Sequence, residues 1–147
     1  MSTSDLVIPI LESLWLAKKA TELLPELPSG MKPSHIRVLH AIHQQLAQNG
    51  SVRVSDVSSA LQITKPSITK LINELADLAM LKKVTDAADK RIVLLELTPP
   101  GQDCVQQYVL DYHAKLATLF SRLEREKYLS MIDTVAFIHQ AMQEVSA

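Results

Sequence analysis

The chain has 147 residues, 47% of them hydrophobic and only three of them glycine, which suffices for one domain with its own core. Fifteen Lys and Arg against sixteen Asp and Glu give a formal net charge of −1, which excludes binding to nucleic acid through bulk charge. The single cysteine, Cys104, excludes an internal disulfide framework, and an aromatic content of 4% beside recurring aliphatic residues favours a mainly α fold. No apolar run is long enough to span a membrane, and no positive charge precedes the first apolar segment, as it would in a signal peptide. We therefore expect a cytoplasmic protein without membrane span or signal peptide.

Two helices are predicted in the first third of the chain. Aliphatic residues at helical spacing predict the first over residues 6–24, and the prolines of segment 25–33 then break the chain. A second helix is predicted over 34–48. We expect Ser34 to cap its start and Gly50 to stop it.

A helix-turn-helix pattern follows. A short strand is predicted over 52–54, and two apolar clusters then flank a tight turn at 62–64. We expect Ser55 to cap the first helix of the motif and Thr64 to cap the second. Pro66 fits the opening turn of the second helix, because the N–H groups there have no helical partner.

The period changes from helical to alternating near residue 80. Segments 81–85 and 91–97 are predicted to be two strands joined by a polar turn, which makes a β-hairpin. Thr98 is expected to cap a long helix opened by two prolines, and a last helix follows it. The order of elements predicts a mainly α winged helix-turn-helix with a two-stranded β-wing and additional helices at both ends.

Helical geometry separates the residues of the motif's second helix. At about 100° per residue from Ile68, the other aliphatic residues fall on one side, and the polar residues point outward. Outward Asn, Lys and Thr side chains suit base edges, and the helix N-terminus suits a phosphate. The residues expected to contact DNA here are Lys65, Pro66, Ser67, Thr69, Lys70 and Asn73.

Near the hairpin tip, Asp89 and Arg91 lie two residues apart, on the same side of a strand, with Lys90 between them. Arg91 can enter a narrow minor groove, and Asp89 can hold its guanidinium by a bidentate pair. The alternative is an ordinary exposed ion pair, and the neighbouring lysines are then simply solvated. Because residues 50–97 carry seven bases and six acids, attraction to DNA has to come from their placement.

Two parts of the sequence resemble the MarR family of bacterial transcription regulators. One is the stretch SDVSSALQITKPSITKLINELADLAMLKKV, and the other is Asp89-Lys90-Arg91 followed by Leu97-Thr98 and a glycine three residues further on. The resemblance implies a homodimer on a pseudo-palindromic operator in double-stranded DNA. It divides a single domain of residues 1–147 into a DNA-binding lobe, 34–98, and a dimerisation region, 1–24 with 99–147. The family usually has a glycine before the wing; this chain has Ala79, so we expect no left-handed glycine cap there.

The resemblance also implies a repressor that a small molecule releases from DNA. Trp15, His43, Tyr108 and Tyr112 are candidates for the lining of an effector pocket. Packing in the core is the alternative for the aromatic side chains.

Metal or redox sensing is a further alternative. His40 and His43 lie one turn apart but lack a third ligand, and Cys104 and His113 point to opposite sides of their helix, so we assign no metal and no cofactor. Cys104 follows a helix start that can lower a thiol pKa; a packed, inert thiol is the other interpretation.

A winged helix that binds only protein competes with the DNA-binding function. We expect no enzyme, because no catalytic triad, phosphate loop or metal cluster is present.

Overall fold

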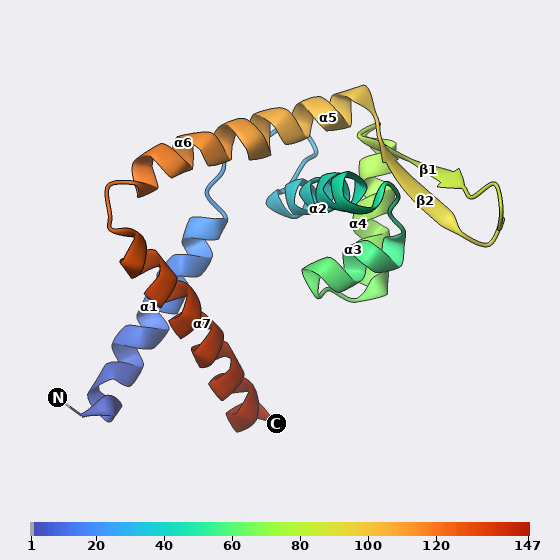
Figure 1. Ribbon diagram of the computed structural model, residues 1–147. Coiled ribbons are helices and arrows are strands. Elements are labelled where there is room, and N and C mark those ends of the chain that lie inside the picture. Colours follow the sequence, from blue (N-terminus) through green and yellow to red (C-terminus); the bar gives the residue numbers. More distant parts are fainter. Residues whose placement is uncertain (1) are drawn as a thin grey trace. The chain divides into compact units, whose positions relative to one another are not determined.

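A computed structural model describes residues 2–147 and confirms the mainly α fold with one antiparallel two-stranded sheet (Figure 1). The chain divides into two compact units, one up to Leu110 and one from Asp111 onward. In chain order the elements are η1 (Thr3–Leu6), α1 (Val7–Thr21), α2 (Pro33–Asn49), α3 (Val54–Leu61), α4 (Lys65–Asp77), β1 (Leu81–Thr85), β2 (Val93–Leu97), α5 (Pro99–Val105), the π-helical turn η2 (Gln106–Leu110), α6 (Asp111–Phe120) and α7 (Arg125–Ser146).

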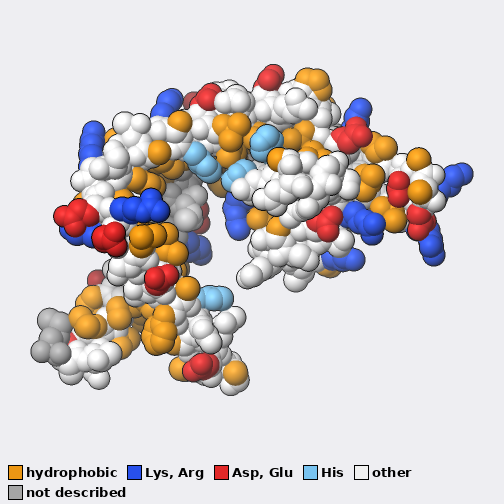
Figure 2. Space-filling model, in the orientation of Figure 1, with side chains coloured by type: hydrophobic (Ala, Val, Ile, Leu, Met, Phe, Trp, Pro, Cys, Tyr) orange, Lys and Arg blue, Asp and Glu red, His pale blue; other side chains and the backbone are white. Residues whose placement is uncertain are grey.

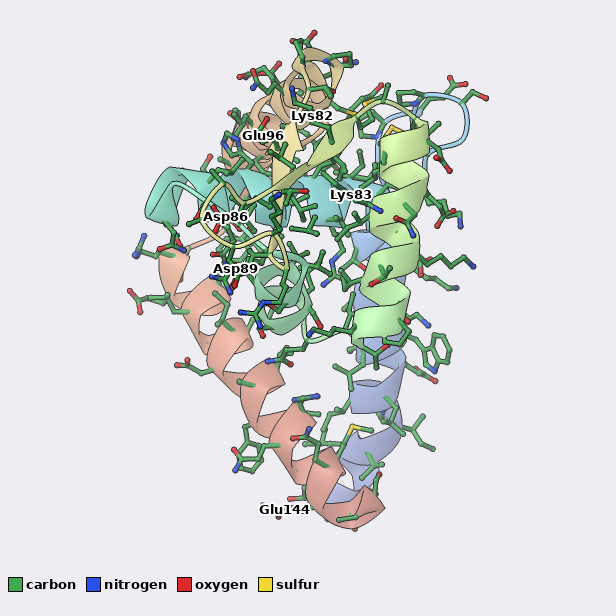
Figure 3. All side chains as sticks on the ribbon, turned by 90° about the vertical axis from the view of Figure 1, so that its right-hand side faces the viewer. Lys82, Lys83, Asp86, Asp89, Glu96 and Glu144 are labelled. Carbon is green, nitrogen blue, oxygen red and sulfur yellow. The ribbon has the colours of Figure 1, made fainter. Side chains whose placement is uncertain are left out.

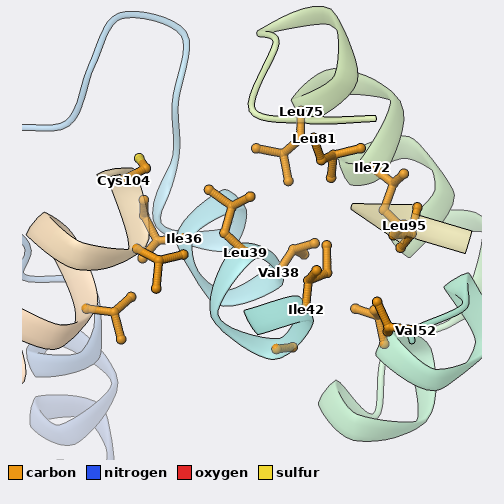
Figure 4. Close-up of a cluster of buried hydrophobic side chains, with 14 of the residues drawn as sticks. Ile36, Val38, Leu39, Ile42, Val52, Ile72, Leu75, Leu81, Leu95 and Cys104 are labelled. Atoms are coloured by element: carbon orange, nitrogen blue, oxygen red, sulfur yellow. The ribbon is translucent and has the colours of Figure 1, made fainter. Parts of the chain in front are cut away.

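The core of the first unit is built around α2, which contacts α3, α4, α5 and β2. Leu39 and Ile42 on α2 are fully buried, and so are aliphatic side chains of α4 and of both strands (Figure 4). Fully burying one such side chain contributes about 1.5–3 kcal/mol. This packing fixes the position of α4 and of the wing relative to α2.

The start of α2 differs from the prediction. The helix begins at Pro33 with Lys32 as its N-cap, so the expected cap by Ser34 is wrong. The N–H of Lys32 donates to Nδ1 of His35 at 2.9 Å, and proline in the first turn sacrifices no helical hydrogen bond. At the other end Gly50 has φ +77° and stops the helix as predicted.

The cap predicted at Ser55 is also wrong. Helix α3 begins at Val54, and the N–H of its N-cap, Arg53, donates to Oδ2 of Asp56 at 2.8 Å. A side chain three residues inside the helix thus satisfies the cap, as in one half of a capping box. Thr64 is the N-cap of α4 as predicted, although its hydroxyl donates to Ser67 Oγ and not to the backbone.

The strand predicted over 52–54 is reduced to one isolated bridge between Arg53 and Leu94. The N–H of Leu95 donates to the carbonyl of Val52 at 2.9 Å, which attaches this segment to β2. Because α3 already begins at Val54, too little extended chain remains for a strand.

The turn between α4 and β1 is held at several points. Ala79 has φ +60°, so an alanine takes the left-handed conformation that glycine usually supplies. Thr98 Oγ1 donates to the carbonyl of Ala79 at 2.6 Å and accepts the N–H of Gly101 at 3.1 Å, which confirms its predicted cap of α5. A Cβ on Gly101 would lie 1.9 Å from the carbonyl oxygen of Met80, so only glycine fits.

The long helix expected after Thr98 is interrupted by the π-helical turn η2. Tyr108 and Val109 of this turn are buried. In the second unit, the hydroxyl of Tyr128 donates to the carbonyl of Phe120 at 2.7 Å, across the turn between α6 and α7. No helix in residues 2–147 is long and apolar enough to cross a membrane.

Candidate nucleic-acid interface

Helix α4 presents a polar face to solvent. Ile68, Ile72 and Leu75 are at most 1% exposed and pack into the core. The residues expected to contact DNA are all exposed, namely Lys65, Pro66, Ser67, Thr69, Lys70 and Asn73. The structure therefore brings these six side chains together on one helix, at its N-terminus and along its outward face.

The wing carries a two-point pair between Asp89 and Arg91. Arg91 donates from Nε to Oδ1 and from Nη2 to Oδ2 of Asp89, each at 3.1 Å. The backbone N–H of Arg91 also donates to Oδ1, at 3.0 Å. Hydrogen bonds from Arg91 hold the pKa of the Asp89 carboxyl below its usual value of 3.8. The Arg91 side chain is 91% exposed and that of Asp89 34%, so the carboxylate sits against the loop while the guanidinium remains accessible.

One contact of this surface is absent from the sequence-based prediction. Lys83 Nζ, on β1, donates to Oδ1 of Asn73 on α4. The adjacent Lys82 instead pairs with Glu96 across the hairpin, with Nζ and Oε2 3.7 Å apart. Figure 3 shows Lys83 beside α4 and Lys82 beside Glu96. The alternation of side chains along a strand is the only sequence signal for this difference.

Acidic and basic side chains lie together on the wing, at the right of Figure 2. Figure 3 shows Asp86 and Asp89 at its tip, and Lys90 and Arg91 follow directly in the sequence. Because Asp89 is already paired with Arg91, it adds little free negative charge there. The exposed Arg91 guanidinium is therefore a local positive group on a chain whose net charge is −1.

Behind the outward face, Glu74 of α4 approaches two residues at the start of α2. Its Oε2 lies 3.6 Å from Lys32 Nζ, and its Oε1 lies 3.7 Å from Nε2 of His35, which is 1% exposed. Burial lowers the pKa of His35 below 6.5, against the opposing attraction of Glu74. Since Nδ1 accepts the N–H of Lys32, the neutral ring carries its proton on Nε2, facing Glu74. This cluster connects α2 to α4.

A hollow of about 630 Å³ lies elsewhere on the first unit, between α2, β2 and α5. Leu46, Leu97 and Val105 supply apolar lining, and His43 belongs to the lining as well. The other three candidates for an effector pocket do not line this hollow. Tyr108 is 8% exposed in the core, Trp15 is 63% exposed under Lys18, and Tyr112 belongs to the second unit.

The sensing alternatives gain no support. Cys104 is buried, and desolvation raises the pKa of its thiol, so the lowered pKa considered for a redox switch is contradicted. Burial of the thiol disfavours the charged thiolate. No group of three or more metal-ligating side chains meets within residues 2–147.

The polar face of α4 beside a two-stranded wing defines a winged helix-turn-helix protein. A model of the MarR family matches residues 29–92, which contain α2, α3, α4 and β1. This match confirms the resemblance to the MarR family over the helix-turn-helix part of the chain.

Among curated proteins, the chain is 24% identical over 95 residues to the uncharacterized HTH-type transcriptional regulator YhbI of Bacillus subtilis. The match covers 64% of this chain and 62% of YhbI, so it spans less than two thirds of that relative. The relative is described as a regulator, which agrees with the expectation that this chain is not an enzyme.

Two solved structures share the fold. S. aureus MepR in its complex with DNA has a TM-score of 0.65 and 20% identity, covering 97% of this chain and 99% of MepR. BpsR of Bordetella bronchiseptica, whose DNA binding is regulated by 6-hydroxynicotinic acid, has a TM-score of 0.66 and 22% identity, covering 90% of this chain and 98% of BpsR.

Proposed function

We propose that this protein is a sequence-specific, DNA-binding transcription regulator that acts in the cytoplasm as a homodimeric repressor. The observation that carries the proposal is the exposed Arg91 guanidinium, held by Asp89 on a wing that follows the exposed polar face of α4. A guanidinium suits the negative potential of a narrow minor groove, and the α4 side chains suit base edges in the major groove. The complex of MepR with DNA supports the proposal at the level of the family fold.

A dimer is supported by apolar side chains that each unit leaves exposed. On α1 these include Ile8, Trp15 and Leu16, and on α7 they include Ile132 and Phe137. Exposed apolar area of this extent commonly marks an interface between protein chains. In a two-fold dimer the two α4 helices would address half-sites about 34 Å apart, which matches a pseudo-palindromic operator. A regulator bound to such a site in a promoter obstructs RNA polymerase, and we therefore propose that the protein acts as a repressor.

We further propose that a small molecule weakens the complex with DNA. The hollow beside His43 has apolar lining from α2, β2 and α5, and Glu96 and Gln102 add polar groups to the lining. Its size is within the usual range for small-molecule sites, about 300–1,000 Å³. The regulation of BpsR by 6-hydroxynicotinic acid supports a small-molecule effector.

The proposal is tested with the purified full chain and the DNA upstream of its own gene. We expect saturable binding to one duplex containing an inverted repeat, and affinity that falls steeply as salt rises. A scrambled duplex of equal length is the control. Weak binding that is the same for both duplexes and insensitive to salt would contradict the proposal and favour a winged helix that binds only protein.

A further inference from the structure

Two adjacent lysines of β1 point to opposite faces of the wing. Lys82 lies opposite Glu96 in the register and pairs with it at 3.7 Å. Lys83 lies opposite Leu95, which is buried against the core. Strand alternation therefore directs Lys83 to the side of the sheet that packs on α4, as Figure 3 shows.

At α4 the ammonium of Lys83 meets the last residue of the outward face. Its Nζ donates to Oδ1 of Asn73, and both side chains are exposed. Asn73 follows Thr69 by one helical turn, so it ends the row of side chains proposed to face the bases. A residue of the wing thus determines which groups Asn73 presents to solvent.

We propose that Lys83 is a positioning residue that sets the base preference of Asn73; the proposal rests on the DNA-binding function proposed above. An asparagine amide offers one accepting oxygen and two N–H donors, and lysine offers donors only. Lys83 occupies one of the two lone pairs of the Asn73 oxygen, so the remaining outward groups of the pair are mainly donors, the amide and ammonium N–H groups.

A pair of side chains that offers mainly donors distinguishes the two purines. In the major groove guanine presents two acceptors, N7 and O6, whereas adenine presents the acceptor N7 and the donor N6–H. An unrestrained asparagine matches adenine with both its oxygen and its amino group. Lys83 therefore shifts the preference of Asn73 from adenine to guanine at one base pair of each half-site.

The test is selection of duplexes from a randomised pool by the full chain and its variants. We expect the wild type to prefer guanine at one position, and Lys83→Met to shift that position towards adenine by about tenfold. Lys83→Arg, which also offers only donors, retains guanine. Asn73→Ala loses the preference at this position, and the matched control Lys82→Met leaves every position unchanged.

A second measurement uses the protein without DNA. By NMR, Lys83→Met is expected to move the side-chain NH2 resonances of Asn73, and Lys82→Met is expected to leave them in place. Unchanged Asn73 resonances in Lys83→Met would overturn the proposal. It is also overturned if Lys83→Met retains every base preference and only flattens the salt dependence, since Lys83 is then a phosphate contact and the proposed function stands. A wild-type chain that selects no sequence overturns both proposals.

Discussion

Asp89 binds Arg91 through both carboxylate oxygens while the guanidinium stays exposed on the wing. Two roles of Asp89 predict opposite effects of Asp89→Asn on the affinity for DNA: a negative charge that repels DNA, and a partner that holds Arg91 in position. Removal of a negative charge near DNA strengthens binding if only charge matters, whereas loss of the pair releases Arg91 from its position.

We expect Asp89→Asn to weaken DNA binding by up to about fivefold, the range of an exposed ion pair, although the net charge becomes more positive. Equilibrium titration of a duplex with the wild type, both single variants and the double variant with Arg91→Ala measures the coupling. In the Arg91→Ala background Asp89→Asn is expected to cause no loss. Tighter binding by the single variant Asp89→Asn would contradict the aiming role.

Ala79→Gly is expected to stabilise the protein. The residue has φ +60°, where a Cβ is strained, and glycine relieves that strain at some cost in chain entropy. The net gain should be about 0.5–1 kcal/mol in the free energy of unfolding, measured by urea denaturation followed by circular dichroism. Ala60→Gly, at an exposed site within α3, is the control and should destabilise by a similar amount. A loss of stability in Ala79→Gly would be inconsistent with this backbone conformation.

His35 should make stability depend on pH. Its pKa is lowered by burial in the folded chain and returns towards 6.5 on unfolding, so below 6.5 the unfolded chain binds more protons. The stability due to the neutral ring is present above pH 6.5 and is lost as pH falls towards the lowered pKa. Protonation also removes Nδ1 as acceptor for Lys32. Urea midpoints between about pH 6.5 and 5 are expected to fall more steeply for the wild type than for His35→Gln; equal slopes would refute this.

Cys104 should react slowly in the folded protein. Its side chain is 5% exposed, and burial raises the pKa of its thiol, so little thiolate is present or accessible. Alkylation by iodoacetamide at pH 8 is expected to be at least about tenfold slower than in urea-unfolded protein, as followed by mass spectrometry. Since Cys104 is the only cysteine, the signal has one source. Equal rates in both states would show that the thiol is not buried.

The sequence predicts the order of elements, the polar face of α4 and the Asp89–Arg91 motif, because these depend on periodicity and short spacing. It does not predict the caps at Lys32 and Arg53. In each cap a side chain inside the helix, His35 or Asp56, folds back and accepts the N–H of the N-cap residue. Local propensity allows a serine cap at Ser34 or Ser55 equally well, so it does not distinguish the two arrangements.

Other features depend on contacts between distant segments. The left-handed Ala79 is held by Thr98, which lies 19 residues further along the chain. Asn73 and Lys83 meet because the hairpin packs on α4, and only the strand alternation of the lysines is visible beforehand. The hollow beside His43 likewise needs α2, β2, α5 and η2 in place, so residue type alone could not select its lining.

The most direct test of the proposed DNA-binding surface compares Lys70→Ala and Arg91→Ala with Lys19→Ala, an equal loss of charge on the exposed surface of α1. All three variants should retain wild-type thermal unfolding, since each side chain is exposed. We predict that the first two weaken operator binding by about tenfold or more and that Arg91→Ala lowers the salt slope by about 0.9, while Lys19→Ala binds as the wild type does. Wild-type affinity and salt slope in both Lys70→Ala and Arg91→Ala would contradict the assignment of this surface to DNA.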